Sequence, residues 1–447
     1  MIKKLAYSFG AIATALSQSL STYVIFFYVD VMKLPASLAV VGGVAYAVWN
    51  AISEPIVGYV SDHTRTRWGR RIPYIAAGAI PLGILYFLIW VPPFEGHRQI
   101  FPLFAYFIAL ISLFAGFYAI TILNWTSLYP EMYPSLKERA EVNAYRQGFG
   151  MLGLVVGIAL PPLIYNRWGW GWMGAMFGIM ISLSLLIALW GSHERKEFSL
   201  DRPLPLRVAL KTMLGNRTFF IFVFANLFVQ YTLTQILVTF PFFAKYILNA
   251  KPFQTTLILA VAFLTALPTL FIWKRLALKY GTKRCYMASM FMLVIFLTPF
   301  LFAKSFKVIL LTSAFVGSCL AGFILNSDVI ISDMIDEDEV NTGGRREGIF
   351  FGMMIFIARF AIGLQVLTMS SVFILSRYNP HAPSQPLGFL FGLRLLIAGF
   401  PIIALIFGFA IMKLYPLSGK KLEELKIKLA EVHAMKIDLM RNSSADD

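Results

Sequence analysis

Twelve stretches of the chain are apolar for long enough to cross a lipid bilayer as helices. A hydrocarbon core of about 30 Å needs roughly 20 apolar residues in helical form. Charged residues make up only 14% of the 447 positions, whereas soluble domains carry about 25%. Too few polar side chains remain to cover a water-facing surface, so we expect an all-α integral membrane protein. The stretches are centred near residues 17, 47, 82, 114, 156, 182, 230, 262, 294, 318, 360 and 402.

The net charge of +16 predicts an orientation rather than a nucleic-acid partner. Most of the 39 Lys and Arg lie in the polar segments between the apolar stretches, without a basic groove interleaved with aromatic residues. Basic residues are retained on the cytoplasmic side of a membrane. With both termini in the cytoplasm, most of the basic residues fall on that side. We therefore expect a multi-pass protein of the cell membrane with both tails inside.

A polar stretch follows the sixth span and predicts a division of the chain into two halves. Each half also has a Gly-plus-basic loop after its second span, at Trp68–Arg71 and at Tyr280–Arg284. Such a duplication is typical of transporters built from repeats around a midplane site; two coincidental basic loops are the alternative. The predicted units are a six-helix bundle over 1–192, a cytoplasmic loop over 193–217, a second six-helix bundle over 218–415 and a cytoplasmic tail over 416–447.

Two motifs resemble those of the glycoside–pentoside–hexuronide:cation symporters, a branch of the major facilitator superfamily. The first runs from Trp49 to Pro55 and continues through Asp62 to a basic loop, and the second is an acidic run from Asp333 to Glu339 followed by Thr342-Gly-Gly-Arg-Arg-Glu-Gly348. The resemblance covers nearly all of the spans. It implies the major facilitator fold, with twelve helices in two pseudo-symmetric bundles, a substrate pathway between the halves and cation coupling in the first half.

Several positions depart from the pattern of the melibiose permease, the familiar member of that family. Asn50 and Glu54 occupy the positions of the two second-span aspartates, so one carboxylate of the sodium site is missing. Ala15 and Ile122 occupy the positions of two further aspartates, in the first and fourth spans. We therefore expect the family scaffold without the galactoside site, and not sodium:melibiose symport.

The candidate coupling site is Glu54 with Asn50 and Ser53. These residues are spaced at i, i+3 and i+4, which places them on one helical face. A carboxylate in a membrane span is costly and usually faces the protein interior, where desolvation favours its protonated form. With a single carboxylate present, H⁺ is favoured over Na⁺ as the coupling ion, and no cofactor or bound metal is expected. A structural ion pair between Glu54 and an arginine is the alternative.

Arg146 and Arg359 are the candidate substrate-binding cations, one in each half. The resemblance matches them to the arginine of the fifth span and the lysine of the eleventh. Two guanidinium groups favour a carboxylate, sulfonate or phosphate, which they can bind bidentately; neutralisation by Glu54 or Asp328 is the alternative. Amide and aromatic side chains can complete a sugar site, although amides also join membrane helices. These candidates are Gln18, Tyr23, Asn124, Trp125, Gln230, Gln235 and Gln365.

Charged residues at the cytoplasmic ends form a predicted conformational network. In the superfamily such loops pair charges between neighbouring helix ends and hold one state of the transporter; without the resemblance, the basic loop is a topology signal alone. The first half contributes Asp62, Arg65, Arg67, Arg70 and Arg71, and the second half contributes Asp333, Asp336, Glu339, Arg345 and Arg346.

The sequence contains no arrangement that predicts an enzyme. The five histidines are scattered and no Walker loop occurs, so ATP-driven transport by this chain alone is not expected. Three functions stay open. The first is symport of a sugar, glycoside or sugar acid, coupled to a cation and most simply to H⁺, by a monomer using alternating access. The second is transport of an amphiphile such as a lysolipid. The third is a membrane sensor or partner subunit without transport.

Overall fold

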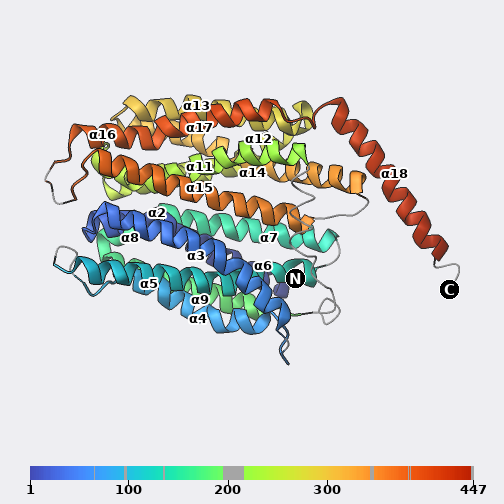
Figure 1. Ribbon diagram of the computed structural model, residues 1–447, viewed down its shortest axis with the longest axis horizontal. Coiled ribbons are helices and arrows are strands. Elements are labelled where there is room, and N and C mark those ends of the chain that lie inside the picture. Colours follow the sequence, from blue (N-terminus) through green and yellow to red (C-terminus); the bar gives the residue numbers. More distant parts are fainter. Residues whose placement is uncertain are drawn as a thin grey trace.

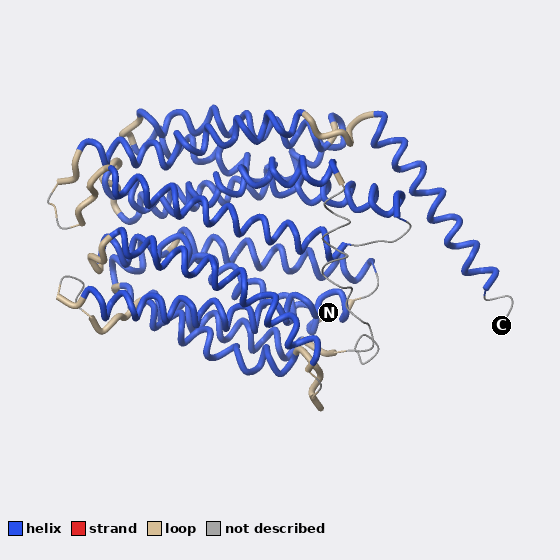
Figure 2. The backbone as a smooth tube through the Cα atoms, in the orientation of Figure 1, coloured by secondary structure: helices blue, strands red, loops and turns tan. Residues whose placement is uncertain are grey.

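The computed structural model describes residues 1–64, 66–94, 98–133, 136–194, 216–342, 347–380, 382 and 384–443. Every regular element in these ranges is a helix, joined by short loops (Figure 2). Within hydrocarbon, a helix is one of the few structures that satisfies its own backbone hydrogen bonds. The all-α prediction is confirmed for this part of the chain.

The helices before residue 195 build the first predicted half. Three of its spans contain a change of helix type or a break. The elements are α1 (Ile2–Ser8), α2 (Gly10–Ile25), η1 (Phe26–Val31), α3 (Ala36–His63), α4 (Ile72–Ile89), α5 (Ile100–Tyr118), η2 (Ala119–Leu123), α6 (Asn124–Met132), α7 (Leu136–Leu154), η3 (Val155–Ala159), α8 (Pro161–Trp168) and α9 (Trp170–Gly191).

The helices after residue 216 build the second half, followed by a helix that extends away from the bundle (Figure 1). The elements are α11 (Arg217–Tyr246), α12 (Pro252–Tyr280), α13 (Thr282–Phe302), α14 (Phe306–Thr342), α15 (Glu347–Leu375), α16 (Leu387–Arg394), η5 (Leu395–Gly399), α17 (Phe400–Lys413) and α18 (Lys420–Ser443).

The predicted spans coincide with these helices. Among the described residues, ten helices are long and apolar enough to cross a membrane, or eleven if the bent pair Glu141–Ala159 and Pro161–Trp168 is one span. The remaining predicted span, near residue 47, falls on α3, whose part Ala36–Asn50 is a shorter apolar helix. Each of the twelve predicted centres therefore lies in a helix.

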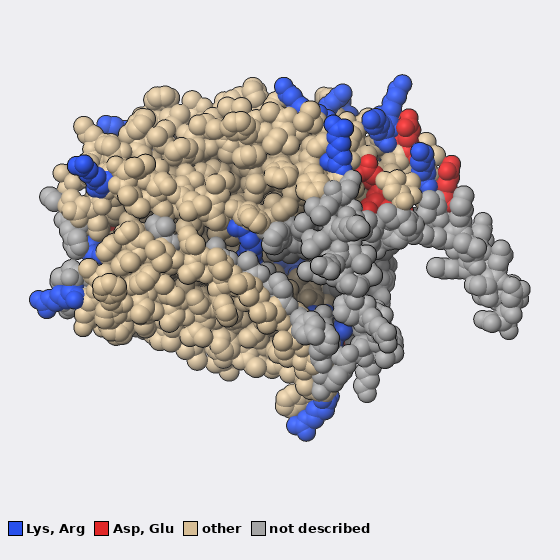
Figure 3. All heavy atoms as spheres, viewed as in Figure 1, with Lys and Arg blue, Asp and Glu red and all other residues tan. Residues whose placement is uncertain are grey.

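The two groups of helices lie side by side, with α2 to α9 in one layer and α11 to α17 in the other (Figure 1). Both chain termini are found at the same end of the molecule, as an even number of crossings requires. We call this end the terminal side and the opposite end the far side. Between them the surface in Figure 3 is almost entirely uncharged, and Lys and Arg gather towards the ends. The exact unit boundaries stay predictions, because residues 195–215 are not described.

In the described ranges, four π-helical segments interrupt the spans, three of them in the first half: η1, η2 and η3. A π-helical turn is wider than an α-helical turn and often occurs at functional sites. The segment η1 contains the acidic residue Asp30, and η2 directly precedes the polar pair Asn124 and Trp125. The segments η1 and η2 therefore occur where polar side chains interrupt the apolar spans.

Close packing between α4 and α9 depends on two facing glycines. A Cβ atom at Gly83 would clash with the backbone carbonyl of Gly178, and one at Gly178 would clash with the carbonyl of Gly83. Little hydrophobic driving force acts between helices in lipid, so their association depends on close van der Waals packing. Small residues such as glycine permit this packing because no side chain separates the two backbones. The backbones of these two helices are therefore in direct contact.

We expect Gly83→Ala to destabilise the protein. The added methyl group clashes with backbone, which cannot rotate away, and overpacking of this kind costs about 1–3 kcal/mol. Thermal denaturation of the purified protein in detergent measures the effect as a lower midpoint temperature. Gly363→Ala in α15 is the matched control, because a Cβ at Gly363 meets no atom within 4 Å. An equal midpoint for the two variants would contradict this account of the packing.

Candidate functional site

Arg146 is the clearest charged candidate within the spans. It lies half-buried in α7, and its guanidinium carbon is 4.6 Å from the centre of the Trp125 ring and 4.7 Å from that of Tyr129. Among the described residues no carboxylate forms an ion pair with it, and its Nε atom is buried without a hydrogen-bond partner. A cation held over two aromatic faces is stabilised there, while the N–H donors around its edge stay available to another group.

Trp125 supports Arg146 rather than offering an open stacking surface. Its indole N–H donates to the carbonyl of Tyr7 at 3.1 Å, and the Tyr7 hydroxyl donates to the carbonyl of Trp125 at 2.7 Å. The ring is 1% exposed, and a Cβ at Gly10 would lie only 2.6 Å from it. The predicted stacking of Trp125 on a substrate is therefore replaced here by a supporting role, since α1 and α2 cover the ring.

Three other predicted substrate residues are buried and bonded within their own half. Tyr23 donates its hydroxyl proton to the carbonyl of Ile158 at 2.6 Å, so its polar atom joins α2 to η3. The amide nitrogens of Asn124 and Gln235 bond to groups four residues away in the chain. Each of these two amides keeps a buried oxygen without a partner in the described part of the chain. Tyr23 thus has a structural role in this conformation, while Asn124 and Gln235 each have an acceptor oxygen that is fully buried in this conformation and unpaired among the described residues.

The remaining predicted substrate residues differ in their exposure. Gln18 is exposed on α2, and Gln230 and Arg359 are half-buried in α11 and α15. Gln365 is buried and lines a very small cavity between the two groups together with Ile25. A common site for these residues stays a prediction. The same holds for the prediction that Arg146 and Arg359 face each other.

The predicted coupling site is described in part. Asn50 and Ser53 are both buried in α3, at 4% exposure each. The Ser53 hydroxyl donates to the carbonyl of Asn50 at 3.4 Å, and the amide oxygen of Asn50 is buried without a partner among the described residues. The side chain of Glu54 lies outside the described residues. Two neutral polar groups therefore do share the buried face that the spacing predicts.

The basic loop of the predicted charge network is fixed by a carboxylate that the sequence did not single out. Glu194, just after α9, accepts hydrogen bonds from the backbone N–H groups of Arg70, Arg71 and Ile72 at 2.6–2.7 Å. A carboxylate at a helix N-terminus satisfies unpaired N–H groups and interacts favourably with the helix dipole. Glu194 therefore caps α4. The loop glycine Gly69, with a φ of 109°, leaves room for that carboxylate.

The other members of the network are only partly described. The side chain of Asp62 and the whole of Arg65, Arg345 and Arg346 lie outside the described residues. The Arg67 guanidinium lies 4.8 Å from the ring of Trp68. In the acidic run, Asp333 and Glu339 are buried and Asp336 is half-buried. Their pairing across the halves stays a prediction.

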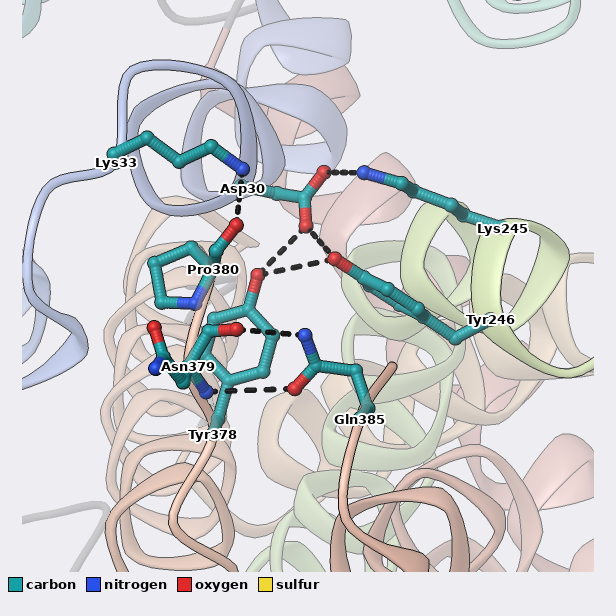
Figure 4. A network of polar contacts seen from close by, with 8 residues as sticks. All are labelled: Asp30, Lys33, Lys245, Tyr246, Tyr378, Asn379, Pro380 and Gln385. Carbon is teal, nitrogen blue, oxygen red and sulfur yellow. Dashed lines mark hydrogen bonds and ion pairs between the residues drawn. The ribbon is translucent and has the colours of Figure 1, made fainter. Parts of the chain in front are cut away.

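A second polar cluster, on the far side, was missed in the sequence. Asp30 in η1 has a side chain with 0% exposure, and its carboxylate accepts hydrogen bonds from Lys245, Tyr246 and Tyr378 (Figure 4). The Tyr378 bond measures 2.6 Å. Lys33 donates to the carbonyl of Pro380 beside it. Asp30 and Lys33 belong to the first group and their partners to the second, so this cluster, which we call the latch, joins the two groups.

The latch lies where the two groups of helices approach each other. The elements in contact across the groups are α3 with α15, η3 and α8 with α12, and α2 and η1 with α11. The rings of Phe26 and Phe242 meet edge to face at 5.1 Å next to the latch. The π-helical segments η1 and η3 and the helix α8 all belong to the far-side ends of their spans. The molecule is therefore joined across its halves on the far side.

A sequence signal for the latch does exist. Asp30 is at the end of the first apolar stretch and Lys245 at the end of the seventh, which are equivalent positions in a duplicated chain. Opposite charges at equivalent ends of two repeats indicate a contact across the repeat axis.

Comparisons with known proteins agree with this architecture. Residues 6–419 match the family described as MFS/sugar transport protein. The chain is 26% identical to the sodium-dependent lysophosphatidylcholine symporter 1 of Mus musculus, over 94% of this chain and 86% of that protein. It is also 26% identical to the isoprimeverose transporter of Lactiplantibacillus pentosus, over 81% and 78% respectively.

A solved structure shows the same fold. The crystal structure of a D-xylose–proton symporter superimposes with a TM-score of 0.65 at 16% identity, covering 91% of this chain and 95% of that one. The resemblance found in the motifs and the expected major facilitator fold are thus confirmed. The family consists of transporters and not of enzymes. This chain belongs to the MFS/sugar transport protein family and is a multi-pass membrane transporter of the major facilitator fold.

Proposed function

We propose that the protein is a proton-coupled symporter of a sugar acid or a related glycoside with a negative group. It works by alternating access, as a monomer of the cell membrane with its termini in the cytoplasm. The observation that carries the proposal is Arg146, a span arginine held over two aromatic rings without an ion-pair partner among the described side chains.

The free donors of Arg146 support a negatively charged substrate. A charged side chain at the centre of a span costs roughly 2.5–3.5 kcal/mol on insertion scales, and the contacts with Trp125 and Tyr129 offset only part of this cost. The guanidinium donors lie in one plane and match the two oxygens of a carboxylate. An anionic solute would supply the missing partner, whereas a neutral sugar would supply weaker hydrogen bonds.

The proposed coupling site is the buried face of α3. Asn50 and Ser53 place neutral oxygen atoms on this face, next in sequence to Glu54. A single carboxylate in an apolar span takes up a proton more readily than it forms a complete sodium site, because Na⁺ requires several oxygen ligands. The sodium dependence named for the lysophosphatidylcholine symporter of the mouse makes Na⁺ the alternative that must be tested.

A lysolipid is the second candidate substrate. The observation that favours it is the 26% identity to the lysophosphatidylcholine symporter of the mouse over nearly the whole chain. A lysolipid carries a phosphate, which would bind Arg146 through the same donors. The two candidates differ in the acyl chain, which only the lysolipid has. Measuring how strongly each compound competes for the binding site therefore shows which of the two is preferred. The family consists of transporters, which argues against the third possibility of a sensor without transport.

We expect Arg146→Gln to weaken binding of glucuronate far more than binding of glucose. Loss of a charge-assisted hydrogen bond costs about 1.5–3 kcal/mol, which is roughly a tenfold to hundredfold change in affinity. Uptake into proteoliposomes, with each sugar and with lysophosphatidylcholine as competitors, measures the difference. Arg394→Gln is the control, because the Arg394 guanidinium donates to the carbonyl of Leu301 on the far side. Equal losses for glucuronate and glucose would argue against charge recognition.

We expect Glu54→Gln to abolish uphill accumulation while leaving exchange intact. A neutral amide imitates the protonated acid, so substrate can still bind and cross, but no proton is released on the other side. Accumulation driven by a pH gradient and counterflow without a gradient, both in proteoliposomes, measure the two processes. Glu424→Gln is the control, because it removes the same charge at an exposed position of α18, outside the spans. Normal accumulation by Glu54→Gln would refute this coupling role, and accumulation driven only by a Na⁺ gradient in the wild type would replace H⁺ by Na⁺.

A further inference from the structure

A cavity of about 530 Å³ lies beside the latch and is lined by both groups of helices. The first group contributes residues of η1, α8 and the start of α9, and the second contributes the end of α11 and the start of α12. Binding sites combine a hollow of several hundred Å³ with a few polar groups. The polar and aromatic residues of this latch cavity are Phe26, Asp30, Tyr165, Asn166, Trp170, Lys245, Asn249 and Thr255.

The exposure of the latch charges is unequal. The side chain of Lys245 is 47% exposed, whereas that of Asp30 is 0% exposed. The lysine can therefore meet a solute in the cavity while it still contacts the carboxylate (Figure 4). A negative group that enters the cavity can reach the ammonium group of Lys245, whereas Asp30, which also lines the cavity, accepts hydrogen bonds from Lys245, Tyr246 and Tyr378.

Positive charge predominates around the latch cavity. Lys33 lies within the latch, and Arg167 and Lys251 are exposed and adjacent in sequence to lining residues. The pKa of Lys33 is lowered, chiefly because its ammonium group is partly buried. The negative charge of Asp30 acts in the opposite direction, and the positive charge of Lys245 lowers the pKa further. An excess of one sign of charge around a recess concentrates ions of the opposite sign. The local field therefore favours an anion.

The rest of the lining suits hydroxyl groups. Asn166 and Asn249 are exposed and come from opposite groups of helices, and an amide can both donate to and accept from hydroxyl groups. Tyr165 stacks on Trp170 with ring centres 4.0 Å apart and an interplanar angle of 6°, which fixes the orientation of both rings. Fixed aromatic and amide groups beside a cation are suited to a sugar ring that carries a negative group.

We propose that the latch cavity binds the negative group of a hydroxylated solute on Lys245, and that this anion displaces Asp30 from the lysine and so weakens the latch. The anion is a carboxylate or a phosphate. The identity of the solute rests on the proposed function, but the site itself is separate from Arg146. A ligand shifts a conformational equilibrium only through a difference in its affinity for the two states, and competition with Asp30 for Lys245 provides that difference.

Calorimetric titration of the purified Arg146→Gln protein tests the site without a contribution from Arg146. The probes are glucuronate, glucose 6-phosphate and glucose. We expect both anions to bind and glucose to bind at least tenfold more weakly. Adding Lys245→Gln should weaken binding of the anions at least tenfold, whereas Lys245→Arg, which keeps the charge, should largely preserve it. Lys304→Gln, at an exposed lysine in the far-side loop after α13, should change it less than twofold.

Two results would overturn the site: no anion binding to the Arg146→Gln protein, or anion binding that Lys245→Gln leaves unchanged while Lys245→Arg folds normally. Neither result bears on the proposed function, which depends on transport by the wild type and on its loss in the Arg146→Gln variant. Conversely, the Arg146→Gln protein could transport glucuronate normally and still bind anions at the latch cavity. That result would refute the proposed function and leave the proposed site intact.

Displacement of Asp30 is tested by distances across the far side. Spin labels at Trp168 and Phe253, which are 54% and 62% exposed in α8 and α12, report the separation of the two groups in a protein with Cys285 and Cys319 replaced by alanine. We expect glucuronate to increase the longer-distance population, and Asp30→Asn to do the same without a ligand. If glucuronate binds but leaves the distances unchanged, displacement of the aspartate is wrong.

Discussion

Each backbone polar group within the spans must find a partner within the protein, because the hydrocarbon core of a membrane offers none. This constraint explains why the regular elements in the described ranges are helices and why so few charges occur between the two ends of the molecule. It also gives meaning to the exceptions. A charged side chain within a span is retained only where a cavity, a partner or an aromatic surface stabilises it.

The described charges within the spans follow that rule in two ways. Asp30 has three donors from the other half of the molecule and is completely buried, so its charge is compensated by the conformation. Arg146 has aromatic rings but no counter-ion among the described residues. The bonds of Asp30 stabilise one relative position of the two halves. Arg146, by contrast, lacks within the described ranges a counter-ion, which a negatively charged solute could supply. In the proposed function, joining the halves and selecting a solute thus fall to different residues.

Hydropathy and residue patterns predicted the fold well and the site only in part. Long apolar stretches determine span positions directly, and all twelve predicted centres lie in helices. Side-chain partners depend on helix rotation and on contacts between residues more than 100 positions apart, which no local pattern contains. For this reason Trp125 and Tyr23 were predicted to bind substrate, although their polar atoms bond to the Tyr7 and Ile158 backbone. For the same reason Glu194 was overlooked, since its partners are backbone N–H groups without a sequence signature.

The bonds of Glu194 also have a mechanical consequence. The loop between α3 and α4 is short and basic, and by itself it would be able to move with either of its helices. Three hydrogen bonds from one carboxylate attach the start of α4 to the chain segment that follows α9, and α4 and α9 are already in backbone contact through Gly83 and Gly178. The third and sixth spans are therefore fastened at their terminal-side ends as well as along their lengths. We therefore expect these two spans and the basic loop to move together as one rigid unit when the first half moves.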